Sequence, residues 1–439
     1  MKIGLISLGC AKNQVNSEQM LWLLREAGYA VSLETGDADA VIVNTCGFIE
    51  SAKSEAIEQI LALGEEKRAG RLGKIIVTGC LSQRYKQEVL DELPEVDAVL
   101  GCGSFDRIVF AVNAVLDGER PAWFGDIDAD VEETARVLTT GPGWAYLKIA
   151  EGCDNRCAYC VIPTLRGKYR SRPMENLLAE ARALSEGGVK ELILVAQDIT
   201  RYGVDLYGRR SLHRLLSELA QIPGLKWLRL HYLYPDEIDD QLIEVIVRED
   251  KILPYLDIPI QHISDKVLAA MNRRGTGEEI RALFRTLRAR IPGLVLRTSL
   301  ITGLPGEREA EFESLCDFLR EEKLERAGVF PYSPEEGTIA AEMPNRPGQD
   351  VAERRAELAR ALEADIMDAY ARSRIGKMEA VLCEGYDGEL DLFYGRSYAE
   401  SPDVDGRILL RGEGLRPGAF VRARLIEMRD GELLGVAQK

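Results

Sequence analysis

The chain has 439 residues, of which 46% are hydrophobic, and this is enough for about three domains with ordinary cores. Its net charge is −16, so it would repel nucleic acid unless basic residues gather on one surface. No apolar run approaches the roughly 20 residues that span a bilayer, and no stretch is typical of a signal peptide. We therefore expect a cytoplasmic protein that does not bind membranes.

The first 117 residues alternate short apolar strands with amphipathic helices. Strands are expected over residues 2–9, 40–45, 74–79 and 97–101. Helices are expected over residues 17–27, 51–63 and 83–93 and again after Ser104, with Ser17 capping the first. Strand–helix alternation at this spacing predicts an open parallel α/β sheet covered by helices.

Three cysteines directly follow three of these expected strands. Cys10, Cys46 and Cys80 each occupy a strand-to-helix turn. Because the carboxyl ends of parallel strands lie along one edge, the topology would gather these thiols, which could hold a three-liganded iron–sulfur cluster. The alternative is three unrelated core residues. Cys102 follows the fourth strand in the same way, and we favour a spare thiol or a packing residue over a fourth ligand.

A turn-rich acidic connector over residues 118–143 leads to a second α/β region. Its strands are expected over residues 145–150, 191–197, 227–233, 256–261, 295–302 and 327–331. Its helices are expected over residues 175–186, 212–220, 237–247, 277–290 and 309–322. This pattern predicts a partial, TIM-like (β/α) barrel with its chemistry at the carboxyl ends of the strands. A helix over residues 350–373 then leads to a glycine-punctuated tail that predicts a small antiparallel β-barrel.

The cysteine triplet Cys153, Cys157 and Cys160 follows the first strand of the second region. Three thiolates in this C-x3-C-x2-C spacing can hold a 4Fe–4S cluster and leave one iron open to a substrate or cofactor. A zinc loop or a purely structural triplet is the alternative, but zinc would want a fourth ligand and the next cysteine is Cys316. The odd total of nine cysteines also argues against a disulfide framework. The spacing, with Tyr159 before the third cysteine, resembles the radical S-adenosylmethionine (SAM) superfamily.

Other side chains near the triplet or at the expected strand ends are weaker candidates for cofactor binding. These candidates are Tyr159, Gln197, Gly303 and Arg170. Arg170 belongs to a basic run that could equally be a solvated loop, and the glycine could simply make a turn. His231 and His262 could face a substrate, but we favour hydrogen-bonded structural roles for both.

The three regions together resemble the methylthiotransferase family, whose members carry an amino-terminal cluster domain, a radical-SAM barrel and a terminal TRAM barrel. The motifs that carry the resemblance are GCAKNQVNSE at residues 9–18, NTCGFIE at 44–50 and TGC at 78–80. Asn16 departs from the acidic residue of many relatives. We expect domains over residues 1–120, 140–372 and 373–439.

The resemblance implies an enzyme with two 4Fe–4S clusters that consumes two SAM molecules in each turnover. The triplet would hold the cluster that cleaves SAM to a 5′-deoxyadenosyl radical, which abstracts hydrogen from an unactivated carbon. Cys10, Cys46 and Cys80 would hold the second cluster, whose open iron carries the sulfur that is methylated and transferred. A flavodoxin- or ferredoxin-type donor would supply electrons.

Members of this family modify either tRNA adenosines or an aspartate of ribosomal protein S-twelve (uS12). Stretches that resemble the ribosomal-protein branch are residues 9–13, 229–235, 332–338, 395–396 and 401–406. Residues 374–439 carry ten Lys or Arg and twelve Asp or Glu, whereas a barrel that grips tRNA should be basic. We therefore expect a uS12 aspartate methylthiotransferase whose product is 3-methylthioaspartate. The alternatives are a tRNA adenosine methylthiotransferase and a non-enzymatic iron–sulfur factor of ribosome assembly.

Overall fold

The computed structural model describes residues 1–130 and 133–438 and divides into two compact units. The first unit comprises Met1–Thr139, Lys148–Arg172 and Ser333–Ala341. The second comprises Thr140–Leu147, Pro173–Tyr332 and Glu342–Lys439. The segment with the cysteine triplet therefore packs with the amino-terminal sheet. The expected domain boundaries stay a prediction. Residues 131–132 of the expected connector, and residue 439 at the end of the expected carboxyl-terminal domain, lie outside the described residues.

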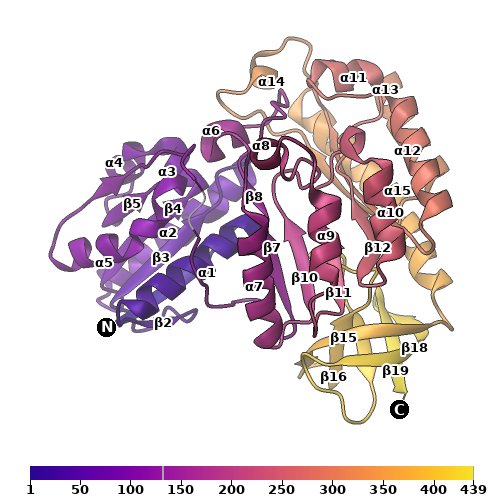
Figure 1. Cartoon of the computed structure of the whole chain (residues 1–439). Helices are drawn as coiled ribbons and strands as arrows, with labels where there is room; N and C mark the ends of the chain where they lie inside the picture. The colour runs from indigo at the N-terminus through magenta and orange to yellow at the C-terminus, as the bar shows by residue number, and fades with distance from the viewer. Residues whose placement is uncertain (131–132, 439) are drawn as a thin grey trace. The chain divides into compact units, whose positions relative to one another are not determined.

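The first unit is built on a six-stranded sheet with the order β2-β1-β3-β4-β5-β6. Its strands are β1 (Lys2–Ser7), β2 (Ala30–Ser32), β3 (Ala40–Thr45), β4 (Lys74–Gly79), β5 (Ala98–Leu100) and β6 (Ala122–Trp123). Strands β2, β3, β4 and β5 of this sheet are labelled in Figure 1. All neighbours pair in parallel, which confirms the expected open parallel sheet. Strands β2 and β6 are short edge strands that were not predicted. From β1 the chain first adds β2 on one side and then crosses to add β3 on the other side, so the strand order reverses between β1 and β3.

Helices cover both faces of this sheet. They are α1 (Ala11–Glu26), α2 (Glu50–Arg68), α3 (Cys80–Tyr85), α4 (Gln87–Glu92), the 3-10 helix η1 (Cys102–Arg107) and α5 (Ile108–Leu116). Helix α6 (Ile162–Arg166), from the triplet segment, packs against α3 and η1. Helices α1 and α5 pack with Ile42 of β3 in one apolar core. Helices α2, α3 and α4 pack with Val43 of the same strand in the other. Alternate residues of β3 therefore point to opposite faces, as the pleat requires.

Several predicted helices differ in their bounds, among them α2, which runs on to Arg68 instead of ending at residue 63. Helix α1 begins at Ala11 because Cys10 is already the extended residue before the first turn, with φ −93° and ψ 166°. Ser17 therefore lies inside the helix, where its hydroxyl donates to Oγ of Ser7 at 2.9 Å instead of capping. The single helix expected over residues 83–93 is broken at Lys86, whose φ is 49°.

The second unit contains an open six-stranded sheet with the order β14-β13-β12-β11-β10-β7. Its strands are β7 (Trp144–Lys148), β10 (Glu191–Val195), β11 (Trp227–Leu230), β12 (Ile252–Asp257), β13 (Val295–Thr302) and β14 (Arg326–Pro331). The pairs from β10 to β14 are parallel, as expected. The strand predicted over residues 256–261 lies earlier, because Pro254 sits where the pairing with β11 is irregular and its missing N–H is tolerated.

The helices of the second unit follow the predicted rhythm, with short additions. They are α7 (Met174–Glu186), α8 (Val204–Tyr207), α9 (Leu212–Ala220), the 3-10 helix η2 (Pro235–Glu237), α10 (Asp240–Arg248), α11 (Asp265–Ala270), α12 (Gly277–Arg290), α13 (Glu309–Glu322) and α15 (Gln349–Ser373). The short helix α14 (Ile339–Glu342) begins in the segment that packs with the first unit. Within the described ranges, no helix is long and apolar enough to cross a membrane.

The carboxyl-terminal strands close into a barrel with the order β15-β16-β17-β19-β18 (Figure 1, yellow). They are β15 (Met378–Asp387), β16 (Leu392–Arg396), β17 (Ile408–Arg411), β18 (Phe420–Arg429) and β19 (Glu432–Gln438). Four of the pairs are antiparallel, as predicted. The pair of β17 with β19 is parallel, which corrects the expectation of an entirely antiparallel barrel.

Buried charges join this barrel to the parallel sheet of the second unit. Glu191, at the start of β10, accepts from Arg229 Nε at 2.7 Å and from Arg396 Nη2 at 2.8 Å. Arg326, at the start of β14, donates to Glu400 at 3.0 Å. These side chains are almost completely buried, so the ion pairs hold strand starts of the sheet against the segment that follows β16.

Candidate functional site

Cys10, Cys46 and Cys80 lie at the carboxyl ends of three neighbouring strands of the first unit. Cys10 follows β1 and precedes α1, Cys46 follows β3, and Cys80 opens α3 directly after β4. Strands β1 and β3 are adjacent in the sheet, and the strand order reverses between them. Open parallel sheets form their ligand crevice at such a reversal, outside the carboxyl ends. The fold therefore places the predicted three-cysteine set where a bound group is expected.

Glycines allow these turns to approach one another. A Cβ atom on Gly9, whose φ is +85°, would lie 2.7 Å from Cβ of Cys46. A Cβ on Gly79, whose φ is +100°, would lie 2.4 Å from the carbonyl oxygen of Thr45. Both conformations strain any residue with a side chain. The two glycines thus bring the cysteine turns close together.

Two buried amides tie the first two turns to each other. Asn13 Nδ2 donates to the carbonyl oxygens of Leu8 at 3.1 Å and Thr45 at 2.9 Å. Asn44 Nδ2 donates to the carbonyl oxygen of Asn13 at 2.8 Å and to Ser17 Oγ at 2.8 Å. Sequence reasoning did not single out either asparagine, although both lie inside the quoted cysteine motifs. Amides that saturate buried carbonyls fix the backbone that presents the thiols.

The thiols at this edge have unequal proton affinities. Burial, together with the neighbouring Cys80 thiolate, raises the pKa of Cys46 to about 11. A hydrogen bond from Cys102, whose Sγ lies 4.0 Å away, and the Arg166 guanidinium lower the pKa of Cys80 to about 6. The same hydrogen bond raises the pKa of Cys102 well above its ordinary value. Of the pair Cys80 and Cys102, Cys80 is therefore the thiol that ionises first, and Cys102 is held protonated beside it.

The triplet Cys153, Cys157 and Cys160 lies on the loop between β8 (Ala150–Glu151) and α6. All three side chains are half-buried. The backbone N–H of Cys160 donates to the carbonyl oxygen of Cys157 at 3.0 Å, and its sulfur accepts from the N–H of Ile162 at 3.4 Å. The loop therefore presents Cys157 and Cys160 from one tight turn, and the N–H of Cys153, earlier in the loop, donates to the carbonyl oxygen of Gly167 at 3.1 Å.

Both sets of three cysteines match the thiolate chemistry of iron–sulfur clusters. Among residues 1–130 and 133–438, no three Cys, His, Asp or Glu side chains converge on a single metal ion. A 4Fe–4S cluster makes a different demand, because each thiolate binds its own iron. All nine cysteines lie in the described ranges and none forms a disulfide, so none of these six sulfurs is tied up in a disulfide bond. The residues at both places therefore fit a three-liganded cluster.

Arg166 of α6 connects the triplet segment to the three-cysteine edge. Its Nη2 donates to Oδ1 of Asn13 and lies 3.4 Å from Sγ of Cys80. Its Nη1 donates to Oδ1 of Asn16 at 3.1 Å and to Glu151 at 3.2 Å. Sequence reasoning treated this arginine only as part of a basic run. The one feature of the sequence that could have indicated a role at the site is the position of Arg166 shortly after Cys160.

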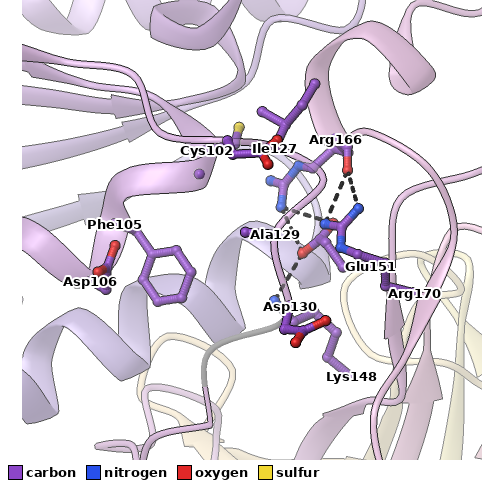
Figure 2. Close-up of a pocket in the computed structure, with 12 residues that line it drawn as sticks. Cys102, Phe105, Asp106, Ile127, Ala129, Asp130, Lys148, Glu151, Arg166 and Arg170 are labelled. Atoms are coloured by element: carbon purple, nitrogen blue, oxygen red, sulfur yellow. Dashed lines mark hydrogen bonds and ion pairs between the residues drawn. The ribbon is translucent and has the colours of Figure 1, made fainter.

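A cavity of about 150 Å³ opens beside these residues in the first unit (Figure 2). Cys102, Lys148, Glu151, Arg166 and Arg170 line it. Lys148 Nζ lies 3.0 Å from Oε2 of Glu151, and burial lowers the pKa of this lysine. The dashed lines of Figure 2 show Glu151 between Lys148 and Arg166. The cavity wall is therefore a compact set of charges next to Cys102.

The segment Ser333–Ala341 packs against both cysteine regions of the first unit. Glu335 accepts from Arg84 Nη1 at 2.6 Å and pairs with Lys53 at 3.1 Å. The N–H of Ala340 donates to the carbonyl oxygen of Ala158, inside the triplet loop, at 2.9 Å. We call this segment the strap. It includes most of the stretch 332–338 that resembled the ribosomal-protein branch.

The weaker candidates are distributed over both units. Tyr159 lies in the triplet loop, and Arg170 donates to the carbonyl oxygens of Arg166 and Lys168. In the second unit, Gln197 follows β10 and Gly303 follows β13. The N–H of Gly303 donates to Glu307 at 3.0 Å, and a Cβ there would lie 2.2 Å from that of Ala352. The close packing against α15 therefore leaves no room for a side chain at position 303.

The two histidines of interest are hydrogen-bonded within the second unit. His231 Nε2 lies 2.9 Å from Oγ of Ser401, on the segment that follows β16. His262 Nδ1 accepts from the N–H of Ser264 at 3.0 Å, and its Nε2 lies 3.3 Å from Glu307. These contacts agree with the structural roles favoured from the sequence. The remaining cysteines, Cys316 and Cys383, are buried in α13 and β15.

Three known families match consecutive parts of the chain. They are the uncharacterized protein family UPF0004 over residues 2–101, the radical SAM superfamily over residues 147–319 and the TRAM domain over residues 375–437. The middle match confirms the resemblance that was based on the cysteine triplet. Together, the first two matches imply SAM and iron–sulfur chemistry.

Full-length relatives decide which radical-SAM family this is. The ribosomal protein uS12 methylthiotransferase RimO of Lachnoclostridium phytofermentans is 49% identical over 440 residues, which cover 100% of both chains. The RimO protein of Acetivibrio thermocellus is 46% identical over 443 residues, which cover 99% of this chain and 98% of that one. This chain belongs to the RimO family. It is a radical-SAM methylthiotransferase with a carboxyl-terminal TRAM barrel, as the resemblance implied.

The fold is also found in more distant radical-SAM enzymes. The structure of the methyltransferase TsrM from Kitasatospora setae, with cobalamin and a 4Fe–4S cluster bound, matches with a TM-score of 0.57. The match covers 77% of this chain and 76% of TsrM at 14% identity. At this identity, the likeness shows the shared architecture alone.

Proposed function

We propose that this RimO-family chain adds a methylthio group to the β-carbon of an aspartate of ribosomal protein uS12, giving 3-methylthioaspartate. The observation that carries the substrate is the full-length identity of 49% to a uS12 methylthiotransferase. The match includes the strap and the segment after β16, where the ribosomal-protein branch was recognised from the sequence. The substrate places the reaction in the cytoplasm.

We assign two 4Fe–4S clusters to the two sets of cysteines. Cys153, Cys157 and Cys160 would hold the cluster that binds SAM, and Cys10, Cys46 and Cys80 would hold the second. When bound, the first cluster would supply the electron that cleaves SAM to a hydrogen-abstracting radical, and the second would supply the sulfur atom. Because acid–base groups do not open an unactivated C–H bond, the chain needs no side chain as acid or base. A flavodoxin- or ferredoxin-type protein is the proposed electron donor.

The chain's own residues bind and orient these groups and exclude water from them. Cys80 is 4% exposed, and the amides of Asn13 and Asn44 hold the turns that present the first two thiols. Tyr159, Gln197, Gly303 and Arg170 are the proposed contacts of SAM. Of these, Gln197 and Gly303 occupy the carboxyl ends of β10 and β13, where barrels of this type carry their ligands.

The carboxyl-terminal barrel supports a protein substrate over tRNA. Arg374 donates to Glu379 at 2.8 Å and to Glu400, and Arg396 pairs with Glu191 and Glu384. Both guanidinium groups are 1% exposed. Ten Lys or Arg are present from residue 374 onward, and at least these two are withdrawn from any phosphate. A basic ribosomal protein suits an acidic chain of net charge −16 better than a polyanion does.

A substrate test decides between these possibilities. Anaerobically reconstituted enzyme receives SAM, sulfide and dithionite, with uS12 protein and bulk tRNA offered separately, and both products are read by mass spectrometry. We expect one methylthio group on an aspartate of uS12 and none on tRNA. Modification of tRNA alone would reject the assigned substrate and support the tRNA enzyme. Assembly of both clusters without SAM cleavage would support the non-enzymatic factor.

A further inference from the structure

Arg166 is the side chain through which the triplet segment reaches the other cysteine set. It lies on α6, shortly after Cys160, yet its Nη2 is 3.4 Å from Sγ of Cys80. We infer that Arg166 donates a hydrogen bond to the Cys80 sulfur and thereby raises the reduction potential of the cluster held by Cys10, Cys46 and Cys80. This inference rests on the cluster assignment of the proposed function.

Hydrogen bonds to ligand sulfurs and nearby charge set the potentials of iron–sulfur clusters. Reduction adds negative charge to the cluster, so a guanidinium beside a ligand sulfur stabilises the reduced state more than the oxidised state. Arg166 is 4% exposed, so solvent screens its charge weakly. Its hydrogen bonds to Asn13 and Asn16 hold the guanidinium at the end of α1 that carries Cys10. The charge is therefore fixed in direction as well as in distance.

Glu151 opposes this effect. Its carboxylate accepts from Arg166 Nη1 at 3.2 Å and lies 3.0 Å from Lys148 Nζ (Figure 2). Arg166 and Glu151 thus place opposite charges near the same sulfur, and both are buried. Removing the cation should lower the potential, and removing the anion should raise it. A purely structural role would not give shifts of opposite sign.

The measurement needs one cluster at a time. In full-length protein with Cys153→Ala, Cys157→Ala and Cys160→Ala, only the second set of cysteines can hold a cluster. The midpoint potential of that cluster is then followed by redox titration with electron paramagnetic resonance. The variants are Arg166→Gln, Arg166→Lys and Glu151→Gln. The matched control is Lys168→Gln, which removes one positive charge from an exposed position of the same segment.

We expect Arg166→Gln to lower the ratio of reduced to oxidised cluster about tenfold at a fixed solution potential, which is about 59 mV for one electron. Arg166→Lys should give a smaller shift in the same direction, because the charge stays but the planar fork is lost. Glu151→Gln should shift the midpoint upward, and Lys168→Gln should leave it unchanged.

Equal midpoints for Arg166→Gln and the parent would overturn the inference. Shifts of the same sign in Arg166→Gln and Glu151→Gln would also overturn it, because they would indicate a general disturbance of the site. If Arg166→Gln does not fold, the upward shift in Glu151→Gln and the smaller shift in Arg166→Lys carry the test. A parent protein that binds no cluster would instead reject the assignment of Cys10, Cys46 and Cys80, on which the inference depends.

Discussion

Arg84 Nη1 lies 2.6 Å from Oε2 of Glu335, although 251 positions separate the two residues in the chain. The same nitrogen donates to the carbonyl oxygen of Gly47, directly after Cys46, at 3.1 Å. Arg84 also belongs to α3, which begins with Cys80. The strap therefore reaches the turns of two proposed cluster ligands through one arginine.

We expect Glu335→Gln to loosen the cysteine turns at the carboxyl edge of the first sheet. Although burial opposes ionisation, hydrogen bonds from Ser333, Arg84 and Lys53 hold the pKa of Glu335 below its ordinary value. Without the Glu335 carboxylate, Arg84 and Lys53 lose a shared negative partner, which should lower the free energy of unfolding by about 2 kcal/mol. The iron content of the second cluster should fall, and the protein should unfold at lower denaturant concentration.

The adjacent Glu336→Gln is the matched control for this prediction. It removes the same charge from an exposed side chain of the strap. We expect wild-type iron content and stability. Equal losses in both variants would show that the strap responds to net charge, and that the contact with Arg84 does not matter.

Substitutions in the two cysteine sets should affect SAM cleavage and methylthiolation differently. Cys46→Ala should abolish methylthiolation and leave SAM cleavage intact, because the proposed cleavage site is the triplet. Cys157→Ala should abolish both reactions. The measurements are 5′-deoxyadenosine by chromatography and methylthiolated uS12 by mass spectrometry. Loss of SAM cleavage in Cys46→Ala would contradict this division of labour.

Cys102→Ala supplies the matched control for the cysteine variants. The Cys102 thiol lies 4.0 Å from the Cys80 thiol. The variant makes the same substitution, cysteine to alanine, as the ligand variants do. Because we regard it as a spare thiol, methylthiolation should persist. Loss of iron from this variant would instead make Cys102 a fourth ligand.

Glu191→Gln should destabilise the second unit. Glu191 accepts from both Arg229 and Arg396, and the three side chains are no more than 1% exposed. Removing the shared anion leaves two buried cations less well compensated, at a cost of about 3–5 kcal/mol. Chemical denaturation and limited proteolysis should report the loss, with earlier release of the carboxyl-terminal barrel. The exposed Glu218→Gln is the control, and matching curves for both variants would rule out this role.

Stability should depend on pH through Glu363 of α15. Burial, together with Glu325, raises the pKa of Glu363 from 4.5 to about 8, and neither carboxylate oxygen accepts a hydrogen bond among the described residues. The folded state therefore holds a proton that the unfolded state has released. The corresponding stability is lost as pH rises from about 4.5 through about 8.

Glu363→Gln has nearly the shape of the protonated glutamate and carries no charge at any pH, so it should remove this pH dependence of stability. Its stability advantage over the wild type should grow by on the order of 3 kcal/mol between pH 6 and pH 8 and then level off. Thermal unfolding across this range measures it. Glu357→Gln, exposed on the same helix, should track the wild type. A constant difference between Glu363→Gln and wild type at every pH would argue against a raised pKa.

The sequence by itself determined the two parallel sheets, the carboxyl-terminal barrel and the family. These features rest on local patterns: apolar strands that alternate with amphipathic helices, cysteines directly after strands, and glycines between short β runs. Helix bounds were less secure. Ser17 was predicted as a cap because the sequence does not show that the helix already begins after the extended residue Cys10. The break at Lys86 depends on one residue with φ of 49°.

Only the tertiary structure decided which distant residues meet around the cysteines. The reversal of strand order between β1 and β3 follows from the pairing of β2, a three-residue edge strand with little signal of its own. Arg166 and Glu335 are ordinary charged residues in the sequence. Their roles arise because folding buries them against Cys80 and Arg84, where a charge must find a partner, and such partners are chosen by topology and burial across the whole chain.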